Sequence, residues 1–448
     1  LKVGRSVVSY GMTAAQRQSG VSENVGLLER VAPARAPRWW TGPVRAVLLV
    51  LGGAAVGLWR TRDPDALNSI WAEDGQNFLT DAVTRPWYEA IFTPFNGYFH
   101  TVARVCWAVV ALFPLEWAAA LSAVLAAVLT AALALAVHAA ARSRLPGMSA
   151  AVIGVTAAVP MGFTPNTLAQ LQFPLVHAGL WMLLWAPSVR WQRVVATVVP
   201  ALAALNSMLG VLLVPFALLR LVRRRDRDSL TKVLALVPGS ALQVVPTLLG
   251  ITERGLGEQP DHNPVSVAAM YLRWGVPRSF LGQAWLAPPH LDAQTHRALV
   301  LAGLLIPAVL LALAVLRRTA PDWELTATLA GFAAVAGAVQ LAAHGGPEDR
   351  YLVLVTLPNM AAAVSLVSPR TANSGRTPLV VLATLLCVVC AANLRVASPR
   401  DGIPAWDGLV VQARAECHAQ HRLQQVTVHI AQWPAIGWQA VLPCDRLR

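Results

Sequence analysis

Charged residues are scarce in this 448-residue sequence, since Asp, Glu, Lys and Arg together make up 13% of it. Soluble domains carry about 25% charged residues, whereas here 56% of the residues are hydrophobic. This composition argues against an ordinary soluble enzyme and predicts an integral membrane protein. The length allows on the order of ten membrane spans of about 20 residues each, with room for one or two sizeable loops.

Several chemical motifs are also missing. The sequence has no Gly-rich phosphate-binding loop, no dinucleotide fingerprint, no HExxH zinc motif and no GxSxG elbow. Their absence argues against a nucleotide-driven pump and against a membrane metalloprotease. No motif requires a cofactor, and the need for a divalent metal stays open.

The five cysteines fall into two sets. Cys106, Cys387 and Cys390 lie in apolar runs, where we expect them to be small buried residues. Cys417 and Cys444 bracket a polar segment, and no CxxC or HxxxH pair accompanies them. If this segment lies outside the cytoplasm, we expect a disulfide bond between these two cysteines.

Positive charge predominates, and the net charge of +13 comes mostly from arginine. In a soluble protein this balance would suggest nucleic-acid binding. Here the arginines lie in short segments between apolar runs, as topology signals do, so we expect no nucleic-acid partner. These segments are Arg142/Arg144, Arg190/Arg193, Arg220–Lys232, Arg317/Arg318 and Arg370/Arg376.

One topology puts all these arginine-rich segments on the cytoplasmic side. It requires that the apolar stretch His100–Phe113, which is short for a span, be a juxtamembrane or re-entrant helix. The predicted fold is then all-α and polytopic, with about eleven spans, the N-terminus inside and the C-terminus outside. The spans are roughly 44–59, 117–140, 148–162, 174–187, 192–206, 208–222, 231–250, 298–316, 325–343, 351–367 and 377–395.

The chain divides into three parts. We interpret residues 1–43 as a basic cytoplasmic tail, 44–395 as the membrane module and 396–448 as a small extracytoplasmic domain. In the last part, the segments Val426–Ile430 and Trp438–Leu442 predict a short β-hairpin. The external loops of the membrane module cover about 60–116, 162–174, 251–297 and 344–351.

An acidic segment, Trp71-Ala-Glu-Asp-Gly-Gln-Asn-Phe78, follows the first span. Adjacent side chains of an extended loop point in opposite directions, so we expect only one of Glu73 and Asp74 to face a cleft. A carboxylate flanked by aromatic residues at a membrane surface is suited to act as a general base. The alternative is a pair of solvated loop carboxylates.

Two basic residues follow in the same loop. His100 and Arg104 are four positions apart, so they share one face of the predicted juxtamembrane helix. Such a basic face suits a phosphate or pyrophosphate, because arginine forms charge-assisted hydrogen bonds with phosphate oxygens. The alternative is an interfacial anchor that contacts lipid headgroups.

A second polar segment, His344-Gly-Gly-Pro-Glu-Asp-Arg-Tyr351, interrupts the apolar C-terminal half. Its glycines and proline predict a tight turn just before a span. Arg350 is a candidate for binding a lipid-linked phosphate. Glu348 and Asp349 would orient this arginine or bind a substrate, and Tyr351 completes the predicted substrate site. The alternative is a helix N-terminus whose dipole the acidic residues complement.

Further polar residues are candidates for substrate binding. Asn166, Gln170 and His177 lie around the second external turn, where they could hold sugar hydroxyls or satisfy the backbone broken by nearby prolines. Arg278 lies in the long third loop beside tryptophans. Tryptophans there could stack on a sugar or lie in the interfacial aromatic belt.

The order of these features resembles the GT-C class of polytopic glycosyltransferases, which use polyprenyl-phosphate-linked sugars. The likeness covers about 44–395 and includes the acidic loop after the first span, the juxtamembrane helix and the late turn Glu348-Asp-Arg-Tyr351. The segments around Trp71–Phe78 and Gly97–His100 also look like actinobacterial membrane proteins of this type.

The resemblance implies a donor, an acceptor and roles for particular residues. Asp74 or Glu73 would be the catalytic base, and Arg104 and Arg350 would contact the donor phosphate. The partners would be a polyprenyl-phosphate sugar, membrane lipid, and a glycan, lipid or protein acceptor of the cell envelope. The implied reaction is an inverting transfer on the extracytoplasmic face of the plasma membrane.

Two other functions stay open. A lipid-linked-sugar transporter or flippase would carry charged residues deep within its spans, whereas here the charges cluster at the ends of the apolar runs. The third possibility is a non-catalytic membrane subunit for envelope assembly.

Overall fold

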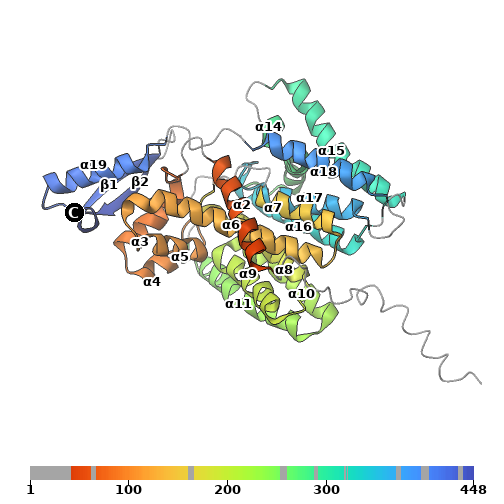
Figure 1. Cartoon of the computed structure of the whole chain (residues 1–448), viewed down its shortest axis with the longest axis horizontal. Coiled ribbons are helices and arrows are strands. Elements are labelled where there is room, and N and C mark those ends of the chain that lie inside the picture. Colours follow the sequence, from red (N-terminus) through yellow and green to blue (C-terminus); the bar gives the residue numbers. More distant parts are fainter. Residues whose placement is uncertain are drawn as a thin grey trace, which may run out of the picture.

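The computed structural model is mostly helical, as the sequence predicts. It describes residues 42–61, 67–159, 166–252, 260–286, 291–316, 319, 321–369, 375–394, 403–431 and 437–448. The predicted basic tail, residues 1–43, lies almost wholly outside them. Figure 1 shows a bundle of helices, with a small sheet at the end opposite the turn between α10 and α11.

Five of the described helices are long and apolar enough to span a membrane. Many of their apolar side chains face outward, such as Val44, Leu48, Leu301 and Leu305, each more than half exposed. In water such a surface would be costly, but a bilayer is an apolar solvent for it. These helices are α2 (Pro43–Arg60), α6 (Ala118–Arg142), α11 (Arg227–Leu248), α15 (Ala293–Val315) and α16 (Trp323–His344).

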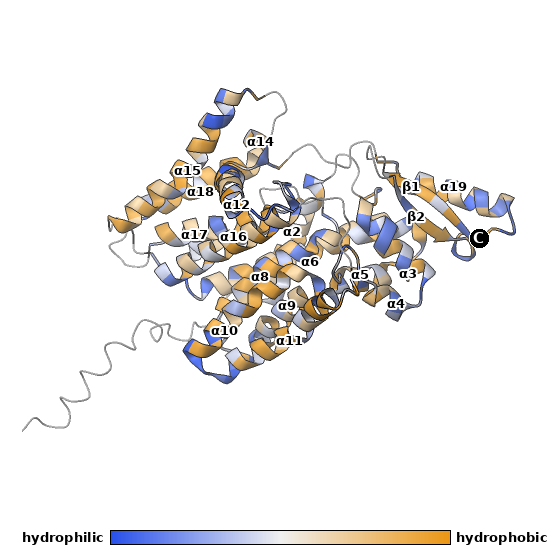
Figure 2. Cartoon of the chain, turned by 180° about the vertical axis from the view of Figure 1, so that it is seen from behind, coloured by the Kyte–Doolittle hydropathy of each residue, from blue (hydrophilic) through white to orange (hydrophobic). Residues whose placement is uncertain are grey.

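The other predicted spans also contain helices, but shorter ones. They are α7 (Gly147–Ala158), α8 (Gln172–Leu184), α9 (Arg190–Asn206), α10 (Leu213–Arg224), α17 (Val353–Val367) and α18 (Thr377–Ala392). The predicted break near Asn206 is present, because Ser207 adopts an extended backbone between α9 and the short helix that precedes α10. Figure 2 shows apolar residues along these helices and polar residues gathered at their ends.

Local sequence signals explain several helix ends. Pro43 begins α2, where its missing N–H would have no helical partner. Asp226, Asp292 and Asp322 each cap the first turn of a helix, α11, α15 and α16 respectively. Gly345, at φ +64°, ends α16 in the left-handed conformation and turns the chain into the second polar segment.

Two helices occupy the middle of the bundle. Most residues of α8 and almost all of α17 are buried, and the two helices contact each other. Phe173, at the start of α8, makes an edge-to-face contact with Tyr351, just before α17, with ring centroids 6.4 Å apart. The beginnings of both helices therefore lie at the same place.

Short helices form the first loop. A π-helix (Asp74–Leu79) continues into α3 (Thr80–Thr84), followed by α4 (Trp87–Phe92) and α5 (Thr101–Val110). The predicted juxtamembrane helix corresponds to α5, which packs against α4, α6 and α9. Shorter helices α12 (Pro264–Met270), α13 (Val276–Leu281) and α14 (Gln283–Leu286) lie in the third loop, with a π-turn (Tyr271–Gly275) between α12 and α13.

The C-terminal segment forms the predicted β-hairpin and, in addition, a helix that was not predicted from the sequence. It comprises α19 (Trp406–Ala419), β1 (Gln425–Ala431) and β2 (Trp438–Pro443), and the two strands pair antiparallel. The predicted disulfide bond between Cys417 and Cys444 is confirmed. Of the other cysteines, Cys106 is buried as expected, but Cys387 is exposed because it lies on the outward face of α18.

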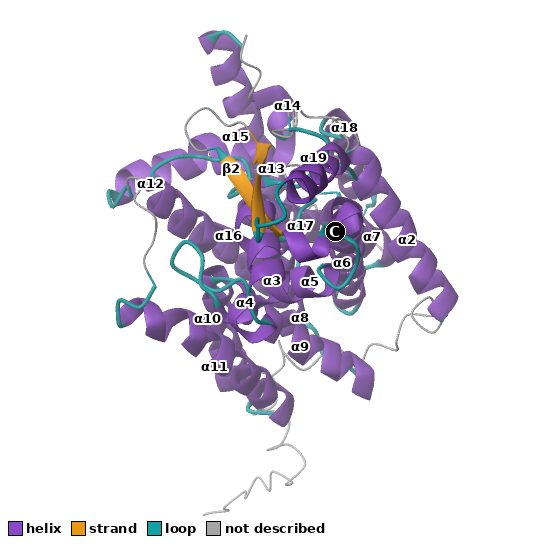
Figure 3. Ribbon diagram, turned by 90° about the vertical axis from the view of Figure 1, so that its left-hand side faces the viewer, coloured by secondary structure: helices purple, strands orange, loops and turns teal. Residues whose placement is uncertain are grey.

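The C-terminal unit sits on the first loop (Figure 3). The backbone N–H of Val441 donates to Thr80 Oγ1 at 3.0 Å, and that of Gln439 donates to Gln76 Oε1 at 3.1 Å. The indole of Trp406 donates to the carbonyl oxygen of Leu115 at 2.7 Å. Strand β2 thereby braces the π-helix, which begins at Asp74 of the acidic pair.

Candidate functional site

The predicted acidic pair lies on a helix rather than on an extended loop. Glu73 has helical backbone angles and immediately precedes the π-helix that begins at Asp74. Successive residues of a helix are separated by about 100°, so the two side chains still point in different directions. Short π-helical turns are frequent at functional sites.

Asp74 points into the protein and is 2% exposed. Its Oδ1 accepts hydrogen bonds from the indole of Trp107 at 2.7 Å and from the backbone N–H of Ala169 at 3.1 Å. A buried carboxylate is tolerated where donors surround it. Asp74 therefore joins the first loop to α5 and to the turn before α8.

Glu73 points toward the second polar segment instead. Its Oε1 lies 3.0 Å from Nη1 of Arg350, and its side chain is 13% exposed. Its Oε2 is buried and has no hydrogen-bond partner among the described residues. Buried polar atoms are usually paired, so this oxygen is a candidate for contact with a substrate.

Arg350 has three neighbours in this site. Its Nε donates to Glu348 Oε2 at 2.9 Å, and its guanidinium lies 4.8 Å from the ring centre of Tyr351. Burial alone would lower the pKa of Arg350, but Glu73, Tyr351 and Glu348 together raise it, so the guanidinium stays charged. Within the described part of the chain, its Nη2 has no hydrogen-bond partner.

A cavity of about 250 Å³ adjoins this group. Tyr351 lines it, and the ring of Tyr351 stacks on that of His344 at 3.5 Å. Gln172 also lines it and accepts hydrogen bonds from Ser207 Oγ at 2.9 Å and from the Tyr98 hydroxyl at 3.4 Å. The cavity thus brings together the first loop, the start of α8 and the turn after α16.

Gln340 lines the same cavity, and sequence reasoning missed it. It is 2% exposed, and neither its amide oxygen nor its amide nitrogen has a hydrogen-bond partner among the described residues. It lies four residues before His344 on α16, so the two share a face. The sequence signal that could have identified Gln340 is that it is a lone amide in the apolar run Ala333–Ala343.

Arg104 is already engaged in the first loop. Its Nη1 lies 2.7 Å from Asp81 Oδ2 and donates to the carbonyl oxygen of Ala90 at 2.8 Å. Arg104 is 2% exposed, and Arg85 also pairs with Asp81 at 2.9 Å. These contacts brace the loop, and they are separate from those of Arg350.

His100 is buried among aromatic rings. Its ring lies 4.4 Å from that of Tyr98 and 5.2 Å from that of Phe78, and neither ring nitrogen has a hydrogen-bond partner in the described segments. Burial, and secondarily the charge of Arg104, lowers the pKa of His100 to about 3. The imidazole is therefore neutral near pH 7, which differs from the predicted cationic contact to phosphate.

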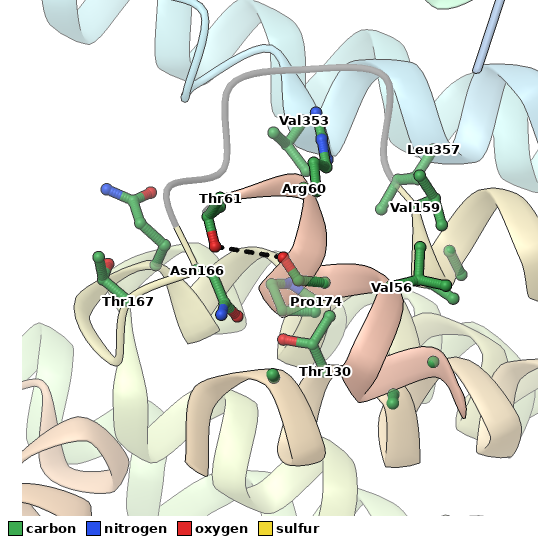
Figure 4. Close-up of a pocket in the computed structure, with 17 residues that line it drawn as sticks. Val56, Arg60, Thr61, Thr130, Val159, Asn166, Thr167, Pro174, Val353 and Leu357 are labelled. Atoms are coloured by element: carbon green, nitrogen blue, oxygen red, sulfur yellow. Dashed lines mark hydrogen bonds between the residues drawn. The ribbon is translucent and has the colours of Figure 1, made fainter. Parts of the chain in front are cut away.

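Two other predicted residues, Asn166 and Gln170, lie at a separate, smaller cavity of about 40 Å³ (Figure 4). This cavity lies between α2, α6, α7 and the start of α8. Asn166 Nδ2 donates to the carbonyl oxygen of Ala123 at 3.2 Å, whereas Gln170 Oε1 is buried without a described partner. His177 is buried further along α8 and lines neither cavity.

Arg278 and Asp349 form an ion pair that joins α13 to the second polar segment. The guanidinium of Arg278 also lies 5.4 Å from the ring centre of Trp274, and burial lowers its pKa to about 10. Asp349 therefore positions the turn that carries Arg350.

The described residues contain no group of three His, Cys, Asp or Glu side chains arranged to hold a metal ion. The candidate site is thus the Glu73–Arg350 pair with Glu348, Tyr351 and the adjoining cavity. No family model, no curated protein and no solved structure matches this chain.

Proposed function

We propose that this protein is a GT-C-like membrane glycosyltransferase that transfers a sugar from a polyprenyl-phosphate donor to an envelope acceptor. The Glu73–Arg350 pair carries the proposal. It sets a carboxylate with one unpaired buried oxygen against a guanidinium with one unpaired nitrogen, beside a cavity. A base and an anion-binding group at hydrogen-bond distance are what acid–base chemistry at a phosphate-linked sugar requires.

Glu73 is the catalytic base in this proposal. Its Oε2 takes the proton of an acceptor hydroxyl as the hydroxyl oxygen bonds to the anomeric carbon. The bond between that carbon and the donor phosphate oxygen breaks, and the lipid phosphate leaves with inversion at carbon. General base catalysis of this kind contributes about 10²- to 10⁴-fold to the rate.

Arg350 stabilises the leaving phosphate. Its Nη2 is available for a phosphate oxygen, and Nη1 keeps the base in position. The ion pair of Arg350 with Glu348 is the weaker of its two pairs, because Glu348 is 52% exposed and screened by solvent. A phosphate can therefore displace Glu348 without disturbing Glu73.

Asp74 acts as a positioning residue. It holds Trp107 and the Ala169 backbone, and in doing so fixes the turn on which Glu73 lies. Its contacted oxygen is occupied by these donors, which makes Glu73 the better base of the predicted pair.

The proposed topology has eleven crossings, with the site and the C-terminal unit outside the cytoplasm. The arginines that lie away from the site support this topology. Arg144 pairs there with Asp322, and Arg223 pairs with Glu324. The Cys417–Cys444 disulfide fits an oxidising compartment.

The test is release of lipid phosphate from a panel of polyprenyl-phosphate sugars, with envelope lipid and glycan fractions as acceptors. We expect the Glu73→Gln variant to lose release by at least about 100-fold. The matched control is Glu89→Gln, an exposed carboxylate of the same loop, which should keep full activity. Full activity of Glu73→Gln, or no release by the unaltered protein with any donor, would overturn the proposal.

A further inference from the structure

The cavity beside Tyr351 has an unusual lining. Among the described residues, no Asp, Glu, Lys or Arg lines it, although charged residues lie close by at Glu73 and Arg350. Its polar lining consists of amides, hydroxyls and the imidazole of His344, and it includes the side chains of Tyr98, Gln172 and Ser207. A ligand held here gains hydrogen bonds but meets no lysine or arginine of the described lining.

In this lining, Gln340 has a buried amide for which the described residues offer no hydrogen-bond partner. Another buried glutamine, Gln243, shows what a structural amide looks like in this protein. Its nitrogen donates to the carbonyl oxygens of Phe99, Ala204 and Leu205 at 3.0–3.2 Å, and its oxygen accepts from the backbone N–H of Phe99. Gln340 is also buried, yet neither of its amide atoms has a hydrogen-bond partner among the described residues, which is unfavourable unless a ligand supplies one.

The amide of Gln340 offers a donor nitrogen, with two N–H groups, and an acceptor oxygen side by side. A pair of neighbouring hydroxyls on a sugar ring matches this arrangement, since each hydroxyl can both donate and accept. The aromatic rings of Tyr98, Phe173 and Tyr351 in the same lining provide apolar surface for the C–H face of a sugar. The cavity is smaller than pockets for drug-sized ligands, about 300–1,000 Å³, which suits a single ring.

We infer that this cavity binds one uncharged glycosyl residue and that Gln340 is its specificity-determining contact. That the bound glycosyl residue takes part in sugar transfer rests on the proposed function, whereas glycoside binding itself does not. Tyr351 connects the cavity with the candidate site, because it lines the cavity and lies against the Arg350 guanidinium. We expect a uronic acid or a phosphosugar not to bind, because no lysine or arginine of the described lining would pair with its charge.

Binding is measured on the full chain in lipid nanodiscs, because sugar-headed detergents would compete for the cavity. The probes are methyl glucoside, methyl galactoside, methyl mannoside and methyl glucuronide, followed by saturation-transfer NMR. We expect at least one neutral glycoside to bind and the glucuronide not to bind. The Gln340→Leu variant should weaken neutral binding at least tenfold, and Gln294→Leu, at an exposed position at the start of α15, should not.

Thermal unfolding separates ligand binding from a structural role. Leucine removes the two unsatisfied amide atoms, so Gln340→Leu should unfold at the same or a higher temperature than the unaltered protein. A lower unfolding temperature, unchanged glycoside binding, equal binding of the glucuronide, or no neutral glycoside bound would each overturn the inference. Glycoside binding without release of lipid phosphate would leave the inference standing and contradict only the proposed function.

Discussion

Glu73 and Arg350 are 277 positions apart in the chain, yet Oε1 of one lies 3.0 Å from Nη1 of the other. Glu73 comes from the loop after α2, and Arg350 from the turn between α16 and α17. The first loop supplies the negative charge of Glu73 and the later turn supplies the positive charge of Arg350. Either charge can therefore be altered by substitution while the other stays in place.

Arg350→Lys tests whether activity needs the planar, two-pronged hydrogen-bonding geometry of the guanidinium in addition to its positive charge. Lysine can contact Glu73 or a phosphate as a point charge, but it cannot hold both in fixed geometry. We expect release of lipid phosphate to fall about 10- to 100-fold, mainly through kcat, with Arg350→Gln falling further. Equal loss in both variants would show that geometry alone is decisive, and no loss in either would remove Arg350 from the site.

Asp74→Ala should destabilise the fold, in contrast to Glu73→Gln. The substitution leaves the Trp107 indole and the Ala169 backbone N–H buried without their acceptor. Each buried unsatisfied donor costs about 1–3 kcal/mol, so for the two donors we expect a loss of about 2–6 kcal/mol. Tryptophan fluorescence during denaturation measures this loss, and Asp74→Asn, which keeps an acceptor oxygen, should recover part of it.

The buried pair of Arg104 and Asp81 should show strong coupling. Removing Asp81 leaves the buried charge of Arg104 unpaired, which costs about 3–5 kcal/mol, whereas removing Arg104 leaves Asp81 with its pair to Arg85. We expect Asp81→Leu to destabilise more than Arg104→Met and the double variant to cost less than their sum. A double-mutant cycle by thermal unfolding checks this, and additive effects would contradict the coupling.

His100 predicts a pH dependence of stability. Its pKa is about 3 in the folded protein and about 6.5 when unfolded, so the unfolded chain binds more protons between these values. The contribution of neutral His100 is fully present above about pH 6.5 and is lost as the pH falls toward 3, at up to about 1.4 kcal/mol per pH unit. The His100→Phe variant should therefore lose less stability than the unaltered protein between pH 7 and pH 5, as measured by thermal unfolding.

Replacing Cys417 and Cys444 by alanine should loosen the C-terminal unit. The disulfide closes a loop with a sequence separation of 27, for which chain entropy gives about 3.5 kcal/mol. Protease cleavage between α19 and β1 should become faster in the double variant than in the control Cys387→Ala, an exposed cysteine of α18. Equal cleavage rates would show that packing alone holds the unit.

Much of the fold follows from local patterns in the sequence. Apolar runs predicted where helices lie, Asp322 and Gly345 delimit α16 through local capping, and alternation predicted the hairpin. The number of spans does not follow from these patterns, because α7 and α8 are shorter than a typical span and α8 is mostly buried. Length and composition alone identify five candidate spans among the described helices.

The candidate site depended on tertiary contacts that no local pattern contains. The choice between Glu73 and Asp74 is made by partners about 30 to 280 positions away, namely Trp107, Ala169 and Arg350. Arg104 has the spacing from His100 that predicts a shared basic face, but in the structure its guanidinium forms an ion pair with Asp81. Gln340 carried almost no signal, since a single amide in an apolar helix is usually satisfied by packing partners.

The contact between the C-terminal unit and the π-helix has a consequence for the order of assembly. Gln439 reaches back 363 positions to Gln76, and Val441 reaches back 361 to Thr80. The acidic segment is synthesised early, but it receives these two hydrogen bonds only after residues 438–443 have been made. Every chain that ends before β2 therefore lacks these contacts to the loop that carries Glu73.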